Sequence, residues 1–350
     1  MNLLSKYRTE LYGFSILWIM IFHGNAVCHV TYFHRFPALN ALDRIIAWGN
    51  MGVEVFILLA GISAYYSFSR DADILSFYKK RMKRLFFPVL LICCPYWLLQ
   101  LTSGKIGISK FLLDITLLRF WVTGDQQIWF VSTIALFYLL FPGIYYMFLK
   151  RCIWKKTDDQ QTEVTVSSFA ALIENLIVVA GLIFIVYRFL PDYYALVEIG
   201  INRLPIFLLG IWMGPLVMQD KSSETGSLVL LILITLFGVY LLWIREAHGI
   251  YRRWLYELIG TPLSLLLAVG FSRLPDRVRA FFRFFGKMSL ELYLAHIVAI
   301  RLNKLGFFFE YTDGAAKKYL ILMLIAVGIA FLAYKLEQMI PAWIEKGRKH

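Results

Sequence analysis

A series of long apolar stretches limits what this chain can fold into more than any other feature of its sequence. A helix needs about 17 to 25 mostly apolar residues to cross the hydrocarbon core of a membrane. Ten stretches of about this length follow one another, at residues 10–30, 50–69, 85–101, 128–149, 169–188, 200–217, 228–244, 255–272, 286–303 and 319–340. The sequence therefore predicts an all-α integral membrane protein, a bundle of about ten transmembrane helices.

Lysines and arginines are distributed unevenly between the loops that join these stretches. The formal net charge of +13 is compatible with nucleic-acid binding, but cytoplasmic loops of membrane proteins also carry an excess of positive charge. If both termini lie in the cytoplasm, the inner segments hold 21 lysines and arginines and the outer segments hold 13. This asymmetry predicts a multi-pass protein of the plasma (inner) membrane with both termini cytoplasmic and no nucleic-acid partner.

No segment between the spans is long enough to predict a separate soluble domain. The longest polar stretch, KRCIWKKTDDQQTEVTVSS, has a loop-like composition. We therefore expect one membrane domain over residues 1–350, with any chemistry inside the bundle. The four cysteines show no paired spacing, so we expect neither a disulfide framework nor a metal site.

Two ionisable residues interrupt the first two apolar stretches, His23 and Glu54. Such groups inside a span mark a functional site by default, because burying them in lipid is costly. A rise of 1.5 Å per residue places His23 about 21 Å from the inner boundary and Glu54 about 7 Å from the outer one, which is nearly the same depth. A carboxylate that orients an imidazole produces a general base. The alternative is a polar pair that only fastens two helices.

A cationic helix face precedes the third apolar stretch. Lys80, Arg81 and Arg84 are spaced so that they share one face at the predicted cytoplasmic surface. Arginine binds phosphate groups in a bidentate manner, so this face is suited to a nucleotide-bearing donor such as coenzyme A. The same residues would also be expected if they only set the membrane topology or contact anionic lipid.

Six segments occur in the order and spacing found in one family of membrane enzymes. They are ELYGFSILWIMIFH, GNMGVEVFILLAGIS, KKRMKRLFFP, QIWFVSTIALFYLLFP, NRLPIFLLGIWMG and GKMSLELYLAH. Through them the chain resembles the membrane acyltransferase 3 family over about residues 6–335. The resemblance implies a ten-span bundle that transfers an acyl group, usually acetyl from cytoplasmic acetyl-CoA, to a carbohydrate hydroxyl at or beyond the outer face. Acetyl-CoA would then be a donor substrate, and no tightly bound cofactor is expected.

The resemblance also implies roles for individual residues. His23 matches the family's catalytic histidine and Glu54 the acidic residue of its second-span motif, while Arg81 and Arg84 match its R-x-x-R motif. Four further motif positions are implied to line the site, with packing or interfacial anchoring as an equal alternative: Trp129, Arg203, Tyr293 and His296. Trp129 and Arg203 are expected near the outer surface and His296 near the middle of the membrane.

One position departs from the family pattern. The family commonly has an arginine eleven residues before its histidine, and here that residue is Tyr12. Arg8 is the nearest replacement, about 60° around the helix and about 6 Å further from His23. This departure implies that the donor is held differently here, that another acyl donor is used, or that activity is lost.

The sequence as a whole predicts a membrane O-acyltransferase that moves acetyl from acetyl-CoA to a cell-surface or lipid-linked carbohydrate, with His23 as general base or as a transient acyl carrier. The expected partners are the carbohydrate acceptor, membrane lipid and proteins of glycan assembly. Two alternatives stay open: a proton-coupled transporter or flippase of lipid-linked sugars that uses His23 and Glu54, and a non-catalytic membrane sensor, which the loss of arginine at Tyr12 favours.

Overall fold

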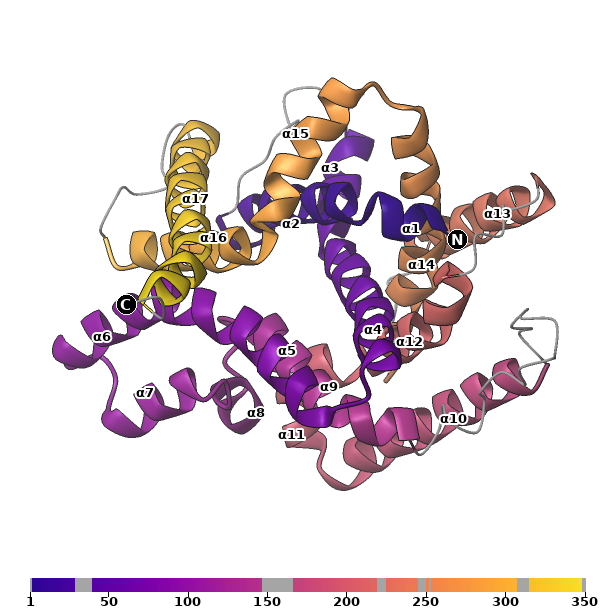
Figure 1. Ribbon diagram of the computed structural model, residues 1–350, viewed down its shortest axis with the longest axis horizontal. Helices are drawn as coiled ribbons and strands as arrows, with labels where there is room; N and C mark the ends of the chain where they lie inside the picture. Colours follow the sequence, from indigo (N-terminus) through magenta and orange to yellow (C-terminus); the bar gives the residue numbers. More distant parts are fainter. Residues whose placement is uncertain are drawn as a thin grey trace.

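A computed structural model describes residues 2–28, 40–146, 166–218, 225–244, 250–251, 253–306 and 315–347. These residues are almost entirely helical and contain no β-strand, so the predicted all-α class is confirmed for the described part of the chain. Figure 1 shows the helices in the view that we use to name them.

The elements of the first half of the chain are α1 (Asn2–Lys6), α2 (Arg8–Cys28), α3 (Asn40–Ala47), the 3₁₀ turn η2 (Trp48–Met51), α4 (Gly52–Arg70), α5 (Ile74–Pro88), the π-helical turn η3 (Val89–Cys93), α6 (Cys94–Thr102), α7 (Ile108–Ile115), α8 (Arg119–Thr123) and α9 (Trp129–Ile144). The second half holds α10 (Val166–Phe189), α11 (Pro191–Ile201), α12 (Leu204–Met218), α13 (Thr225–Ile244), α14 (Trp254–Arg273), α15 (Asp276–Lys287), α16 (Ser289–Lys304) and α17 (Ala315–Gly347).

Among the described residues, six helices are long and apolar enough to cross a membrane. They run over Ile45–Arg70, Ile74–Thr102, Ala170–Phe189, Pro191–Val217, Trp254–Arg273 and Ala316–Met339. Two shorter apolar helices, Trp129–Ile144 and Ile232–Leu241, coincide with the predicted fourth and seventh spans. The predicted first and ninth spans are the helices α2 and α16, which carry more polar residues. A bundle of ten crossing helices remains a prediction.

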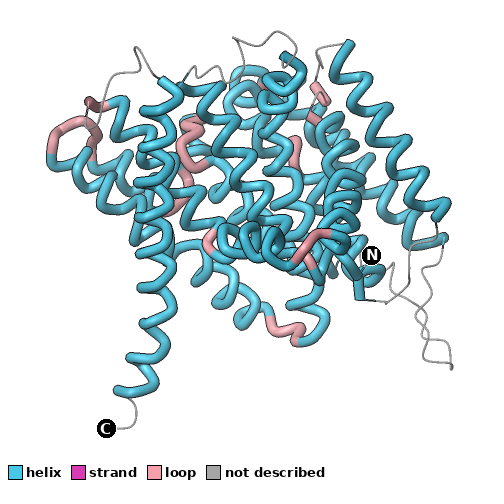
Figure 2. The backbone as a smooth tube through the Cα atoms, turned by 90° about the horizontal axis from the view of Figure 1, so that it is seen from above, coloured by secondary structure: helices cyan, strands magenta, loops and turns pink. Residues whose placement is uncertain are grey.

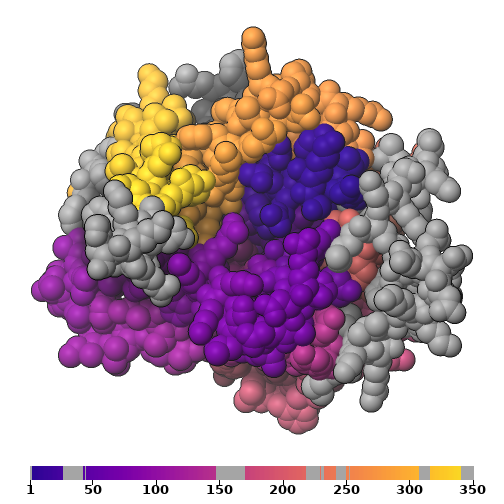
Figure 3. Space-filling view, in the orientation of Figure 1, coloured from indigo at the N-terminus to yellow at the C-terminus, as the bar shows by residue number. Residues whose placement is uncertain are grey.

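Most helices run side by side, and the C-terminal part of α17 extends past the others (Figure 2). We call the end of the bundle where α2 begins the Arg8 end, and the end where α16 finishes the Arg301 end. Part of α17 also lies at the Arg8 end, because its residue Glu337 lines a cavity there together with Arg8. In the space-filling view, the indigo N-terminal segment lies between the orange segment around α15 and the purple segment around α4 and α5 (Figure 3).

Helix α2 is the centre of the arrangement, since it contacts α4, α15 and α16. Glycine makes two of these contacts close. A Cβ atom at Gly13 would lie 1.8 Å from the carbonyl oxygen of Phe282 in α15, and one at Gly52 would lie 2.8 Å from the carbonyl oxygen of Ser15. Small residues let helix backbones approach in this way within membranes. The α2–α4 contact places the first turn of α4 beside the middle of α2.

The third predicted span begins with a capped helix and contains a π turn. The Asp73 carboxylate accepts hydrogen bonds from the backbone N–H groups of Leu75 and Ser76, at 3.3 and 2.8 Å. This is the cap that a helix N-terminus needs. Pro88 ends α5, and the π turn η3 continues the path of the helix into α6. Proline at this position has no N–H to donate, and a π turn is a common way to accommodate the disturbance.

Candidate active site

Two histidines from distant parts of the chain meet at the centre of the candidate site. Nδ1 of His23 in α2 lies 2.8 Å from Nε2 of His296 in α16. The two rings are stacked, with centroids 5.1 Å apart. His296 is fully buried, whereas His23 is half-buried and lines a cavity.

A backbone contact fixes the tautomers of this pair when both rings are neutral. Nδ1 of His296 lies 2.9 Å from the carbonyl oxygen of Leu292. A carbonyl oxygen only accepts, so Nδ1 of His296 carries the hydrogen and its Nε2 has a free lone pair. Nδ1 of His23 must then donate to that lone pair. The remaining nitrogen, Nε2 of His23, is left unprotonated, which is the form that takes a proton from a hydroxyl group.

Glu54 does not occupy the position that we expected for it. Its carboxylate forms an ion pair with Arg203 of the α11–α12 junction, with Oε1 3.0 Å from Nη2, and both side chains are buried. The group that orients His23 is therefore His296 rather than Glu54. Glu54 is buried in the bundle, and the rotation of α4 turns its side chain toward Arg203. A depth estimate carries no information about that rotation.

Arg203 is held on several sides. Its Nη1 donates to the carbonyl oxygen of Ile199 at 2.5 Å, and its guanidinium lies 4.6 Å from the ring centroid of Trp129. A second buried acid, Glu257 of α14, lies near this pair, because its carboxyl group interacts electrostatically with both Glu54 and Arg203. Arg203 is thus part of a buried charged cluster, and the buried Trp129 packs against its guanidinium.

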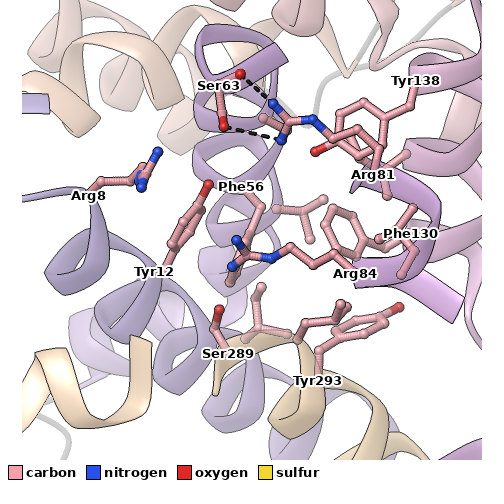
Figure 4. A pocket seen from close by; sticks show the side chains of 16 residues that line it. Arg8, Tyr12, Phe56, Ser63, Arg81, Arg84, Phe130, Tyr138, Ser289 and Tyr293 are labelled. Carbon is pink, nitrogen blue, oxygen red and sulfur yellow. Dashed lines mark hydrogen bonds between the residues drawn. The ribbon is translucent and has the colours of Figure 1, made fainter. Parts of the chain in front are cut away.

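At the Arg8 end, a cavity reaches into the bundle between α2, α4, α5, α9 and α16; we call it the Arg84 cavity (Figure 4). It contains about 800 Å³ of empty space, including solvent at its mouth. Its outer part carries Arg8, Arg81 and Arg84, and its inner part is lined mostly by apolar and aromatic side chains such as Phe56 and Phe130. This arrangement suits a ligand with an anionic head and a long, weakly polar arm.

The two arginines of the R-x-x-R motif behave differently. Arg81 donates through Nη2 to the carbonyl oxygen of Ser63 and through Nη1 to its Oγ, at 3.2 Å, so α5 is tied to α4. The guanidinium of Arg81 also lies over the ring of Tyr138. Figure 4 shows Arg84 reaching into the cavity instead. Two N–H groups of Arg81 are thus bound to Ser63, whereas the guanidinium of Arg84 lies in the cavity, where it can contact an anion.

Arg8 and Tyr12 lie side by side in the wall of the Arg84 cavity. Arg8 is one helical turn before Tyr12 in α2. The Tyr12 ring stacks on Phe56, with centroids 5.1 Å apart and an interplanar angle of 13°. Arg8 and Tyr12 also line a wider cavity at the same end, together with Lys80 and Lys83. Lys80 thus belongs to this wider mouth and is not among the residues lining the Arg84 cavity.

A second cavity opens toward the Arg301 end and contains His23; we call it the His23 cavity. Trp129, Arg203 and Tyr293 are among its lining residues, so the predicted lining role fits the position of all three. Ile19, Val53 and Tyr293 line both this cavity and the Arg84 cavity. One layer of side chains thus separates two spaces that enter the bundle from opposite ends, with His23 beside that layer.

Sequence reasoning missed several residues of this region. Glu257 lies in an apolar run, and the same argument that singled out Glu54 applies to it. Arg253 and Glu198 form a bidentate pair, with N–O distances of 2.7 and 2.6 Å, and only tertiary structure brings these two positions together. Ile19 and Val53 have no chemical signal in the sequence at all. No group of three metal-ligating side chains is found within the described ranges.

Comparisons with known proteins identify the family of this chain. A family model described as an acyltransferase domain, Acyl_transf_3, matches residues 12–335. The O-acetyltransferase OatA of Staphylococcus aureus, from strains NCTC 8325 / PS 47 and COL, is 25% identical over 327 residues, which cover 82% of this chain and 49% of the relative. The chain therefore spans about half the length of the curated relatives it matches. No solved structure matches it.

Proposed function

Because this chain belongs to the acyltransferase 3 family, we propose that it is a membrane O-acyltransferase that moves acetyl from acetyl-CoA to a carbohydrate hydroxyl. The observation that carries the proposal is that two cavities from opposite ends share the wall formed by Ile19, Val53 and Tyr293, with the His23–His296 pair beside this wall. A donor entering from one end and an acceptor entering from the other would meet at His23.

The Arg84 cavity is the proposed donor site. Arg84 and Arg8 bind the phosphate groups of acetyl-CoA, and Lys80 and Lys83 add positive charge at the wider mouth. The pantetheine arm extends along the apolar inner part toward Tyr293. In the proposed topology, ten helices cross the plasma membrane and the Arg8 end, with both termini, faces the cytoplasm, where acetyl-CoA is available.

The His23 cavity is the proposed acceptor site. Nε2 of His23 takes the proton of the sugar hydroxyl while the hydroxyl oxygen attacks the thioester carbonyl carbon. As the C–S bond breaks, the proton passes from His23 to the sulfur, which leaves an acetyl ester and the CoA thiol as products. His296 keeps the reacting nitrogen of His23 free by accepting the hydrogen of its Nδ1. Charge that develops on His23 is thereby shared with a second imidazole.

A proton-coupled transporter or flippase of lipid-linked sugars is the second candidate, because cavities that open toward opposite ends of a bundle are also what alternating access requires. The two candidates differ in whether a thioester is broken. A flippase moves its substrate without consuming acetyl-CoA, and a sensor needs neither reaction nor transport.

Transfer of radiolabelled acetyl from acetyl-CoA to extractable glycan tests the proposal. Membranes that contain the wild-type protein are compared with membranes that contain His23→Ala at matched expression. Loss of general acid–base catalysis is expected to lower the rate about 10²- to 10⁴-fold. The control is membranes without the protein, and the assay contains glycan from the protein's own cell. If wild-type membranes transfer no more label than this control, the acetyl-CoA proposal fails and transport becomes the leading candidate.

A further inference from the structure

The wall of the His23 cavity changes from apolar to cationic along one helix. Tyr293, Ile297, Ile300, Arg301 and Lys304 of α16 all line this cavity. Their spacing follows one face of an α-helix. Near the middle of the bundle this face is aromatic and apolar, and in its last turn it presents a guanidinium and an ammonium group.

Arg301 and Lys304 differ from the two arginines, Arg203 and Arg253, that also line this cavity. Arg203 is neutralised by Glu54, and Arg253 by Glu198 at 2.6 Å. Among the described residues, the ion-pair contact of Arg301 is a distant one with Asp125, at 3.8 Å, and the side chain of Arg301 is 42% exposed. An exposed contact of this length contributes little.

Asp125 is mainly bound elsewhere. It lies 2.8 Å from Arg119, and Arg119 in turn contacts Asp114 at 2.7 Å. Lys304 has no ion-pair partner among the residues that the structure describes, and no acidic residue is among the described residues that line the His23 cavity. Within the described ranges, the positive charge that the end of α16 presents to this cavity is therefore largely uncompensated.

We propose that the acceptor is an anionic carbohydrate, whose carboxylate or phosphate group binds Arg301 and Lys304 while a hydroxyl group lies at His23. This inference rests on the proposed acyltransferase function. A rise of 1.5 Å per residue places Arg301 about 7.5 Å and Lys304 about 12 Å beyond His296 along α16. These distances fit an anion on the acylated sugar or on its neighbour. Arginine and lysine both form charge-assisted hydrogen bonds to such groups.

Polar but uncharged side chains complete the cavity and agree with this assignment. Asn50, Gln126 and Gln127 line it alongside His23. Amide groups both donate and accept hydrogen bonds, as sugar hydroxyls do. The amides are suited to the ring of the acceptor, and the two cations at the end of α16 are suited to its charge.

The test fractionates the product of the radiolabelled transfer reaction on an anion exchanger. We expect the label in the retained, acidic glycan. Carboxyl reduction of the glycan before the reaction removes the acceptor activity if the anion is a carboxylate, and dephosphorylation removes it if the anion is a phosphate. Either result supports the inference and identifies the source of the charge.

Substitutions of Arg301 and Lys304 then test whether these two side chains bind the anionic group of the acceptor. Arg301→Gln and Lys304→Gln should each raise the KM for glycan about 10-fold, as expected for a lost hydrogen bond to a charged group. The KM for acetyl-CoA should stay unchanged, which also shows that the variants are folded. Arg301→Lys should restore part of the acceptor affinity. Lys105→Gln is the matched control, because this exposed lysine follows α6 at the same end and is not among the residues lining the cavity.

Label in neutral glycan, or an unchanged KM for glycan in both variants, would overturn the inference while the acyltransferase proposal stands. Absence of label with the wild-type protein would overturn the proposed function, and this inference with it.

Discussion

Nδ1 of His23 donates to Nε2 of His296 across 2.8 Å, and residues 273 positions apart thereby form one chemical unit. The second histidine selects the tautomer of the first, because its own hydrogen is held by the carbonyl oxygen of Leu292. An orienting group is usually sought among carboxylates, yet an imidazole performs the same task without placing a negative charge in an apolar bundle.

Replacement of His296 should therefore lower turnover without changing donor binding. His296→Phe keeps an aromatic ring but removes the lone pair that accepts from His23, and we expect kcat to fall at least about 10-fold. His296→Gln keeps an acceptor oxygen and should retain more activity than the phenylalanine variant. Steady-state kinetics at varied acetyl-CoA measures both. Equal activity of the two variants would contradict a tautomer-selecting role.

Arg84 and Arg81 should give different kinetic losses although they belong to one motif. Arg84 reaches into the Arg84 cavity, so Arg84→Gln should raise the KM for acetyl-CoA about 10-fold through loss of a charge-assisted contact. Arg81 bonds to Ser63, so Arg81→Gln should mainly lower thermal stability. Kinetics and melting curves of the two purified variants separate these effects. The same KM increase in both would show that the motif binds the donor as a unit.

We expect Arg8 to bind acetyl-CoA in place of the family arginine, whose position is occupied by Tyr12 in this chain. Arg8→Gln is expected to raise the KM for acetyl-CoA, because Arg8 lines the Arg84 cavity. The double variant Arg8→Gln with Tyr12→Arg should recover donor affinity, since residue 12 lies one turn further along the same cavity wall. Tyr12→Phe, which keeps the stacking on Phe56, is the control. Failure of the double variant to recover, with the protein folded, would argue against the replacement.

The Glu54–Arg203 pair should stabilise the bundle rather than act in proton transfer. Arg203→Met leaves the carboxylate of Glu54 buried beside that of Glu257, and loss of one partner of a buried pair costs about 3–5 kcal/mol. Glu54→Gln combined with Arg203→Met should be less destabilised than Arg203→Met alone. Thermal unfolding in detergent tests this double-mutant comparison. A double variant as unstable as the sum of the two single variants would show that the residues are not coupled.

The contact between α2 and α15 should depend on Gly13. A methyl group there would lie 1.8 Å from the carbonyl oxygen of Phe282, so Gly13→Ala must separate the helices and should lower the yield of folded protein. Gly328→Ala is the matched control, because a Cβ atom at Gly328 in α17 meets nothing within 4 Å. Size-exclusion chromatography and melting curves compare the two. An unaffected Gly13→Ala protein would contradict the close approach.

Much of the site could be predicted from the sequence because polar residues are conspicuous in apolar runs. His23 and Glu54 attracted attention for this reason, and both are part of the site region. Trp129, Arg203 and Tyr293, which line the His23 cavity, fall on family motif positions, and so does His296, which contacts His23. The sequence could not predict which polar residues pair with each other, because the pairing depends on how the helices rotate and cross.

By itself, the sequence determined the helical class and the family, since hydrophobic length and residue spacing are properties of local segments. The tertiary structure alone decided that His296 accepts from His23, that Glu54 pairs with Arg203, and that Ile19, Val53 and Tyr293 lie between two cavities. These relations depend on how helices rotate and approach each other. Backbone contacts at residues such as Gly13 and Gly52 set that approach, and packing over the whole bundle sets the rotation.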